Sequence, residues 1–276
     1  METQTLLAHY AHGKRDFQEA FLIGIKLVGI NLSGSNLSGA NLISADLSNA
    51  NLSQTNLIGI NLTNSTLSQA NLIGADLTDA YLSEANLTRA DLSDAKLLNA
   101  YLKDANFTHA QLVNTNLTHA NLSGAKLTHA NLSGANLLNT VLTGVNLTGA
   151  NLSGANLTGV ELCEVNLSGT QIDDTTQLSE KWRLVQKIVT QGAKGWDLSH
   201  VDLSCASLVG VNFTDADLTG ANLAGTHLRS VDLSNAKVKD ASFIACTGLS
   251  KSTKLALKEQ GALVDDDFTP VNLKVS

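Results

Sequence analysis

The chain is poor in aromatic residues, proline and cysteine, and it has no long apolar run. Of its 276 residues 43% are hydrophobic but only 4% are aromatic, and there is a single proline. A globular interior normally interlocks aliphatic and aromatic side chains of mixed shape. The composition therefore disfavours an ordinary globular core and favours a uniform aliphatic stack, as repeat architectures have.

Other absences exclude classes of function. Cys163, Cys205 and Cys246 lie far apart without a CxxC pair, so the sequence predicts no zinc site. No stretch approaches the roughly 18 apolar residues of a membrane span, and the opening lacks a basic segment followed by an apolar one, so we expect a cytoplasmic protein without membrane contact. A net charge of −7 without a basic stripe argues against nucleic-acid binding.

Leucine recurs at every fifth position of the chain. It occupies 29 of the 32 positions spaced by five between residues 17 and 172, and the residue two places before each is mostly alanine. Residues five apart spread around an α-helix and alternate between the faces of a strand, so neither element hides all the leucines.

A chain that turns a corner every five residues does hide all the leucines. Four quintets then close a square coil of about 20 residues, and coils stack about 4.8 Å apart through parallel hydrogen bonds. The predicted core includes leucines from successive coils, namely Leu32, Leu52, Leu72, Leu92, Leu112, Leu132 and Leu152.

The quintets ANLSG, ADLTD and ADLSD resemble those of the pentapeptide repeat family, which are written A(D/N)LXX. The resemblance covers residues 15 to 174 and again 196 to about 245. It implies an all-β solenoid, a right-handed quadrilateral parallel β-helix. The family includes gyrase-protecting DNA mimics and many cyanobacterial proteins, and the segment LLAHYAHGKRDF is similar to the opening of a cyanobacterial heterocyst regulator.

The repeat pattern divides the chain into five parts. We expect an N-terminal helical cap over 1–14, a β-helix of about eight coils over 15–174, a helical insertion over 175–195, a second repeat block of about two and a half coils over 196–247, and a C-terminal helical cap and tail over 248–276. The leucine phase shifts by one across the insertion, so the two blocks are not one continuous run.

Three short helices are predicted outside the repeats. The first covers residues 2–12 and the second about 178–191. The third starts with Ser250 or Ser252 as its N-cap and stops at Gly261. The terminal helices cover the ends of the solenoid, where unpaired backbone groups would otherwise invite association.

Two surfaces are candidates for binding a partner. Tyr81 and Tyr101 are 20 residues apart and therefore adjacent on one wall, with Lys103 beside them, and aromatic residues flanked by charge are typical of interface centres. On the insertion helix, Trp182 lies on one apolar strip, while Leu184 and Ile188 form a second, narrower strip that either packs on the solenoid or remains for a partner.

The remaining polar residues are interpreted as structural. Asparagine, which commonly precedes each leucine, tolerates turn geometry and bonds locally or to its neighbours. His109 and His129 fall in one column without an acid or thiol at matching height, so we predict no metal site, no catalytic residue and no cofactor.

The sequence therefore predicts a non-enzymatic interaction scaffold or regulator that binds another protein. A homodimer formed through a solenoid end or through the insertion is a second option. The alternative function is a DNA mimic that binds a type II topoisomerase, gyrase. Residues 107–160 hold one formal charge, Lys126, whereas duplex DNA carries one charge per about 1.7 Å, which disfavours mimicry.

Overall fold

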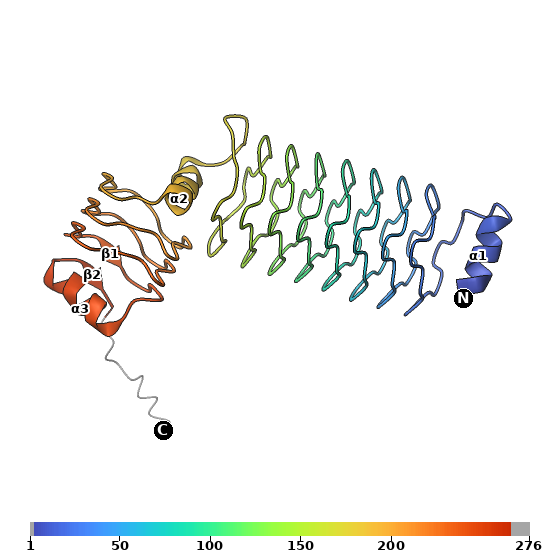
Figure 1. Cartoon of the computed structure of the whole chain (residues 1–276), viewed down its shortest axis with the longest axis horizontal. Coiled ribbons are helices and arrows are strands. Elements are labelled where there is room, and N and C mark those ends of the chain that lie inside the picture. The colour runs from blue at the N-terminus through green and yellow to red at the C-terminus, as the bar shows by residue number, and fades with distance from the viewer. Residues whose placement is uncertain (1–2, 266–276) are drawn as a thin grey trace, which may run out of the picture. The chain divides into compact units, whose positions relative to one another are not determined.

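The computed structural model describes residues 3–265. The chain splits into two compact units, Met1–Gln186 and Lys187–Ser276. The regular elements, labelled in Figure 1, are helix α1 (Thr3–Ala11), helix α2 (Glu180–Gln191), strand β1 (Ser242–Phe243), helix α3 (Lys251–Glu259) and strand β2 (Leu263–Val264). Most of the other described residues belong to quintets in which one residue forms a single β-bridge and a tight turn follows.

The bridges join residues that are 20 apart and run parallel. In the first unit Asn31 pairs with Asn51, which pairs with Asn71, and the other columns repeat the pattern at five-residue intervals. The N–H of Leu32 donates to the carbonyl of Asn51 at 2.8 Å, and the N–H of Asn51 donates to that of Ile30 at 2.7 Å. Each coil thus bonds to the coils beside it, and each unit is a β-helix, as the coils of Figure 1 show.

The leucine positions fill the interior. All seven predicted core leucines, from Leu32 to Leu152, are buried, with at most 2% of their surface exposed. Phe107 replaces leucine at one level and is also fully buried. The small residues two places earlier complete each layer: Ala90 and Ala110 are 0% exposed. Burial of a complete aliphatic layer per coil is the main stabilising contribution of this fold.

The corner of each quintet has a left-handed backbone conformation. Two residues after each core position φ is positive, for example 58° at Asn64 and 60° at His109, and these corners carry mainly glycine, asparagine, aspartate and histidine. Such residues adopt this conformation more readily than others. Gly248 is a special case, because a Cβ there would lie 2.4 Å from the backbone nitrogen of Arg229.

The asparagines before the leucines stabilise the turns, as predicted. The side-chain oxygen of Asn51 accepts a hydrogen bond from the N–H of Ser53 at 3.1 Å, and Asn71 does the same with Ile73 at 3.0 Å. Some also bond along the column: Asn151 Nδ2 donates to Asn131 Oδ1 at 3.3 Å. This local bonding explains the abundance of asparagine without any ligand.

The three predicted helices are present with small shifts. Helix α1 covers Thr3–Ala11, and residue 2 of the predicted helix lies outside the described residues. Its Leu6 is fully buried. Helix α2 begins two residues later than predicted, at Glu180. Helix α3 uses Ser250 as its N-cap, with Ser250 Oγ accepting from the N–H of Thr253. The tail predicted after it lies outside the described residues from 266 onward.

The ladder of the first unit ends with a change of register. Asn156 pairs with Gln177, an offset of one residue relative to the 20-residue pairs before it. Asp173 holds the turn that accommodates this extra residue: its Oδ1 accepts from the N–H of Gly154 at 3.1 Å and from the hydroxyl of Thr175 at 2.7 Å. The second unit resumes the regular spacing, with Asp197 paired to Asp217.

Candidate protein-binding surface

The two predicted tyrosines form a stacked pair on the wall of the first unit. Both occupy the outward position before a core leucine, and the N–H of Leu82 donates to the carbonyl of Tyr101 at 2.8 Å, which fixes the two coils in register. The ring centroids are 4.9 Å apart and the planes differ by 2°. The residues remain 45% and 48% exposed. The fold therefore presents a broad, ordered aromatic surface to solvent.

Charged side chains surround the tyrosine pair. Lys103 follows Tyr101 by two residues and is exposed, and Glu84 and Asp104 occupy the neighbouring corners, also exposed. The structure thus brings Tyr81, Tyr101 and Lys103 together on one wall. An aromatic centre with charges of both signs at its rim has the composition of many protein interfaces.

A groove that the sequence did not reveal adjoins the tyrosine pair. Its volume is about 450 Å³, and it follows the corner of the solenoid towards its N-terminal end. The lining residues are Glu19, Phe21, Gly39, Asn41, Gly59, Asn61 and Tyr81. Phe21 is 74% exposed. In the sequence, the groove is marked only by two neighbouring columns. In one, Gly39 and Gly59 follow Glu19, and in the other, Asn41 and Asn61 separate Phe21 from Tyr81.

Helix α2 has most of its apolar surface buried, which is one of the two options that the sequence left open. Trp182 is 4% exposed and Ile188 is fully buried, together with Val185 on the same side of the helix. Leu184 is half-buried. Burial removes Trp182 and Ile188 from the surface that a partner could touch, because residues 182, 185 and 188 form one buried face and not two separate strips. Leu184 alone remains as a predicted contact residue on this helix.

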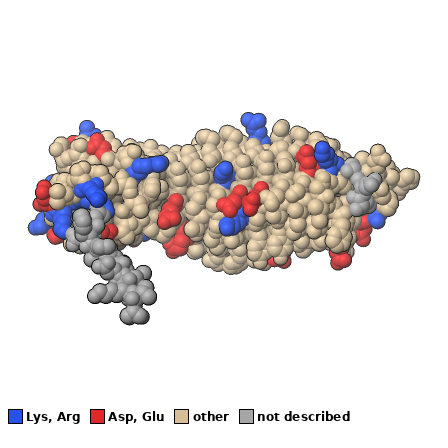
Figure 2. Space-filling view, turned by 90° about the horizontal axis from the view of Figure 1, so that it is seen from below, with Lys and Arg blue, Asp and Glu red and all other residues tan. Residues whose placement is uncertain are grey.

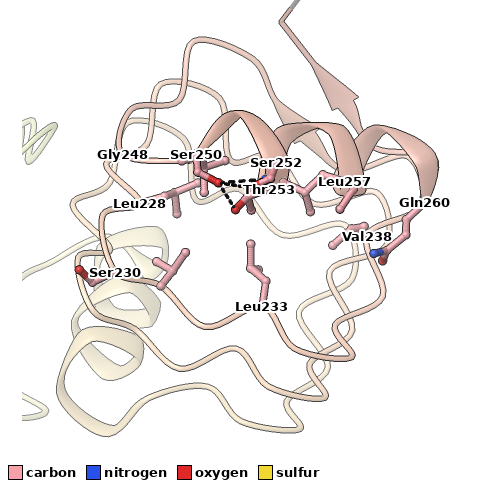
Figure 3. A pocket seen from close by; sticks show the side chains of 13 residues that line it. Leu228, Ser230, Leu233, Val238, Gly248, Ser250, Ser252, Thr253, Leu257 and Gln260 are labelled. Atoms are coloured by element: carbon pink, nitrogen blue, oxygen red, sulfur yellow. Dashed lines mark hydrogen bonds between the residues drawn. The ribbon is translucent and has the colours of Figure 1, made fainter.

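The second unit contains a cavity under helix α3. It has a volume of about 550 Å³ and is bounded by Leu228, Leu233 and Val238 of the last coil on one side and by α3 on the other (Figure 3). The hydroxyl of Ser250 contacts those of Ser252 and Thr253 at 2.8 Å each. Because these hydroxyls bond to one another, they are not directed at a ligand.

The histidine column is an ordered stack on the surface. The rings of His109 and His129 lie 5.2 Å apart with a 13° angle between their planes. Among residues 3–265 there is no group of three or more His, Cys, Asp or Glu side chains that could hold a metal ion. Within the same range, every helix is too short or too polar to cross a lipid bilayer.

Charges are sparse and mixed on the outer surface. On the face that Figure 2 shows, acidic and basic side chains occur singly or in small groups between wide uncharged areas. Two of the ion pairs join residues 20 apart on one column: Lys96 with Asp76 at 3.2 Å, and Lys237 with Asp217 at 2.9 Å. Hydrogen bonds from Thr219 and Lys237 lower the pKa of Asp217 to about 2. These charges stabilise neighbouring coils and form no continuous anionic track on that face.

The architecture and the surface define a β-helix solenoid repeat protein. The family model for pentapeptide repeats matches residues 16–54, 45–83, 85–124, 120–159, 141–176, 197–235 and 206–243. The chain therefore belongs to the pentapeptide repeat family, as its quintets indicated.

Solved structures of the same family are similar to the chain. HetL, a pentapeptide repeat protein involved in heterocyst differentiation regulation from the cyanobacterium Nostoc sp. strain PCC 7120, is 33% identical over 90% of this chain and 99% of its own, with a TM-score of 0.38. Rfr23 from the cyanobacterium Cyanothece 51142 is 48% identical over 34% of this chain and 64% of its own, with a TM-score of 0.34.

A more distant structure belongs to QnrB1, a plasmid-mediated fluoroquinolone resistance protein. It is 19% identical over 60% of this chain and 97% of its own, with a TM-score of 0.33. No curated protein sequence matches the chain.

Proposed function

We propose that the protein is a non-enzymatic interaction scaffold that binds another protein in the cytoplasm through the outer wall of its first unit. The coils of each unit wind as a right-handed quadrilateral β-helix, the form that the family implies; helix α1 caps the first unit and helix α3 caps the second. The wall of the first unit offers a rigid surface on which successive coils are about 4.8 Å apart.

The stacked pair of Tyr81 and Tyr101 carries this proposal. At positions 41, 61 and 121 of this column the residue is asparagine, whose side chain is short and polar. A tyrosine pair that is already ordered by stacking loses little side-chain entropy when a partner covers it. Lys103 at its edge adds a charge that orients the partner, and Leu184 is a separate, secondary contact.

The filled interior supports the same conclusion. The core leucines leave no room for a substrate inside the coils. The activity must therefore reside on the surface. One relative, HetL, is involved in the regulation of heterocyst differentiation. For the present chain we infer a regulatory or scaffolding role of the same broad kind.

The experiment is a partner capture with matched variants. Tyr81→Asn combined with Tyr101→Asn introduces the residue that this column carries at neighbouring levels, so the fold should be retained, as circular dichroism can verify. We expect partner binding to weaken at least tenfold, since two aromatic contacts are lost. Val141→Asn, on another exposed apolar residue of the same column, is the control. Equal binding by all three proteins would refute the role of the tyrosines.

DNA mimicry is tested separately. A gyrase supercoiling assay with the purified protein should show no inhibition, because residues 107–160 carry only Lys126 as a formal charge. Inhibition at a protein concentration near that of the enzyme would favour the topoisomerase alternative over the scaffold.

A further inference from the structure

The groove beside the tyrosine pair has a regular construction. Residues 19, 39, 59 and 79 form one column and residues 21, 41, 61 and 81 the next. In the first column Gly39 and Gly59 separate two acidic residues, and in the second two asparagines separate Phe21 from Tyr81. The result is a slot that is two coils long and two columns wide. Aromatic residues flank it in one column, and acidic residues flank it in the other.

The floor of the slot is open because the glycines have no side chains. A Cβ built on Gly59 would meet no atom within 4 Å, and one built on Gly39 would meet only Cγ of Glu19, at 3.4 Å. The next residues in this corner column, Asp79 and Asn99, carry polar side chains that bond to each other: Asn99 Nδ2 donates to Asp79 Oδ1 at 3.0 Å. The slot is therefore a local interruption of an otherwise occupied column.

The aromatic wall has one ring face directed into the slot. Tyr101 covers one face of Tyr81 at 4.9 Å in a parallel stack. The opposite face points along the column towards Asn61, which pairs with Tyr81 through the backbone. Asn61 is too short to cover that face, and Tyr81 is 45% exposed. Three coil steps, about 14 Å, separate levels 21 and 81, which leaves room for planar groups between the rings.

The charge of the slot is negative. Glu19 lies at one end, with its side chain over the position of Gly39. Asp79 is in the corner beside Tyr81 but does not line the slot itself, since its Oδ1 accepts from Asn99 Nδ2 of the following coil, on the side away from Gly59. Neither column carries a lysine or arginine between levels 19 and 81. A ligand for this slot thus needs a positive charge and a planar or apolar surface.

We propose that the slot binds an arginine side chain of the partner protein. The guanidinium stacks on the open face of Tyr81, and the negative charges of Glu19 at the other end of the slot and of Asp79 in the adjoining corner attract it. Arginine fits better than lysine because its guanidinium is planar, weakly hydrated and able to donate several hydrogen bonds in a fixed geometry. The inference rests on the proposed function and specifies the chemistry of the partner at this wall.

The test is a titration followed by NMR of the full chain. The probe is N-acetyl-arginine amide, compared with its neutral citrulline analogue and with the lysine derivative. We expect saturable shifts of the Gly39 and Gly59 amide signals with the arginine probe, weaker shifts with lysine and none with citrulline. The titration extends to about 100 mM, at which a site with a Kd of about 10 mM is mostly filled.

Two glycine variants provide a matched pair. Gly59→Gln places a side chain in the slot at a corner conformation that glutamine already adopts at Gln54, where φ is 55°. Gly34→Gln makes the same change at a corner outside the slot, where a Cβ also meets no atom within 4 Å. We expect Gly59→Gln to abolish the shift of Gly39 and Gly34→Gln to leave it unchanged. Asp79→Asn should weaken binding by at most about threefold, because it removes a nearby negative charge.

Several outcomes would overturn the inference. These are the absence of saturable shifts, equal shifts with arginine and citrulline, or undiminished binding by Gly59→Gln. If any of these results is obtained while partner capture still depends on Tyr81 and Tyr101, the arginine site is refuted and the proposed scaffold function is retained. If the slot binds arginine but partner capture does not depend on the tyrosines, the proposed function is refuted and arginine binding by the slot is retained.

Discussion

Two buried serines offer a sharp test of how the interior is stabilised. Ser35 and Ser65 occupy equivalent positions, two residues before a core leucine, and are 2% and 1% exposed. The N–H of each donates to a leucine carbonyl three residues earlier at 3.1 Å. Their hydroxyls differ: Ser65 Oγ donates to the carbonyl of Leu62 at 2.6 Å, whereas Ser35 Oγ is the buried side-chain polar atom of residues 3–265 without a partner.

Substitution by alanine should therefore change stability in opposite directions. Ser35→Ala removes an unsatisfied hydroxyl, whose burial costs about 1 to 3 kcal/mol, and leaves a void that costs about 0.3 kcal/mol. We expect a net stabilisation of about 1 kcal/mol. Ser65→Ala loses a hydrogen bond worth about 1 kcal/mol and leaves the same void. We expect a net destabilisation of about 1 kcal/mol, so the variants should differ by about 2 kcal/mol.

The assay is urea unfolding monitored by far-ultraviolet circular dichroism. Both serines lie in the first unit, so both variants report on the same transition, and an unchanged m-value would show that the unfolded state is unaffected. The midpoint should rise for Ser35→Ala and fall for Ser65→Ala. If both midpoints fall equally, the hydroxyl of Ser35 has a partner in solution and the reasoning is refuted.

Three further predictions concern the turns and the ends. Gly248→Ala should destabilise the second unit by about 3 kcal/mol, because a Cβ there overlaps backbone of the preceding coil; a thermal midpoint within 2 °C of wild type, a shift of well under about 1 kcal/mol, would contradict this. The hydroxyl of Thr175 and neighbouring N–H groups lower the pKa of Asp173 to about 2, so its ionised form stabilises the fold above about pH 4 and this contribution is lost as the pH falls towards 2. Asp173→Asn should flatten the acid limb of a pH–stability profile, and an unchanged limb would count against the turn. Leu218→Ala should cost about 3 kcal/mol in urea unfolding, whereas Leu233→Ala, at a half-buried position beside the cavity, should cost about half as much; equal losses would mean that the cavity is closed in solution.

The fold could be predicted because its geometry is local and repeated. A five-residue period that keeps Leu92 and Leu112 in the interior leaves few alternatives to a coil of about 20 residues. The same arithmetic predicts that Tyr81 lies beside Tyr101, and their rings stack with centroids 4.9 Å apart. The choice between Ser250 and Ser252 as N-cap was open, since both precede helix α3, and the structure selects Ser250.

Features that depend on several residues at once were harder to predict. Whether Ile188 is buried stayed open at the level of sequence, because a helical wheel with two apolar strips does not show which of them the tertiary structure covers; the structure buries it. The slot was missed because no single residue marks it: it arises where Gly59 lacks a side chain and Asn61 is short at the same level. Its identification requires comparison of neighbouring columns.

The 20-residue register makes the surface sensitive to the length of a deletion. Excising one full coil, for example residues 111–130, removes 20 residues, so each remaining residue stays in its column. Every face then keeps its residues, and the protein becomes one coil shorter. Excising five residues between Tyr81 and Tyr101 would preserve the leucine period but turn the later coils by a quarter, so the aromatic rings would end on different faces. Insertions and deletions in whole coils should therefore be tolerated while the partner surface is retained, and shorter changes should dismantle it without unfolding the chain.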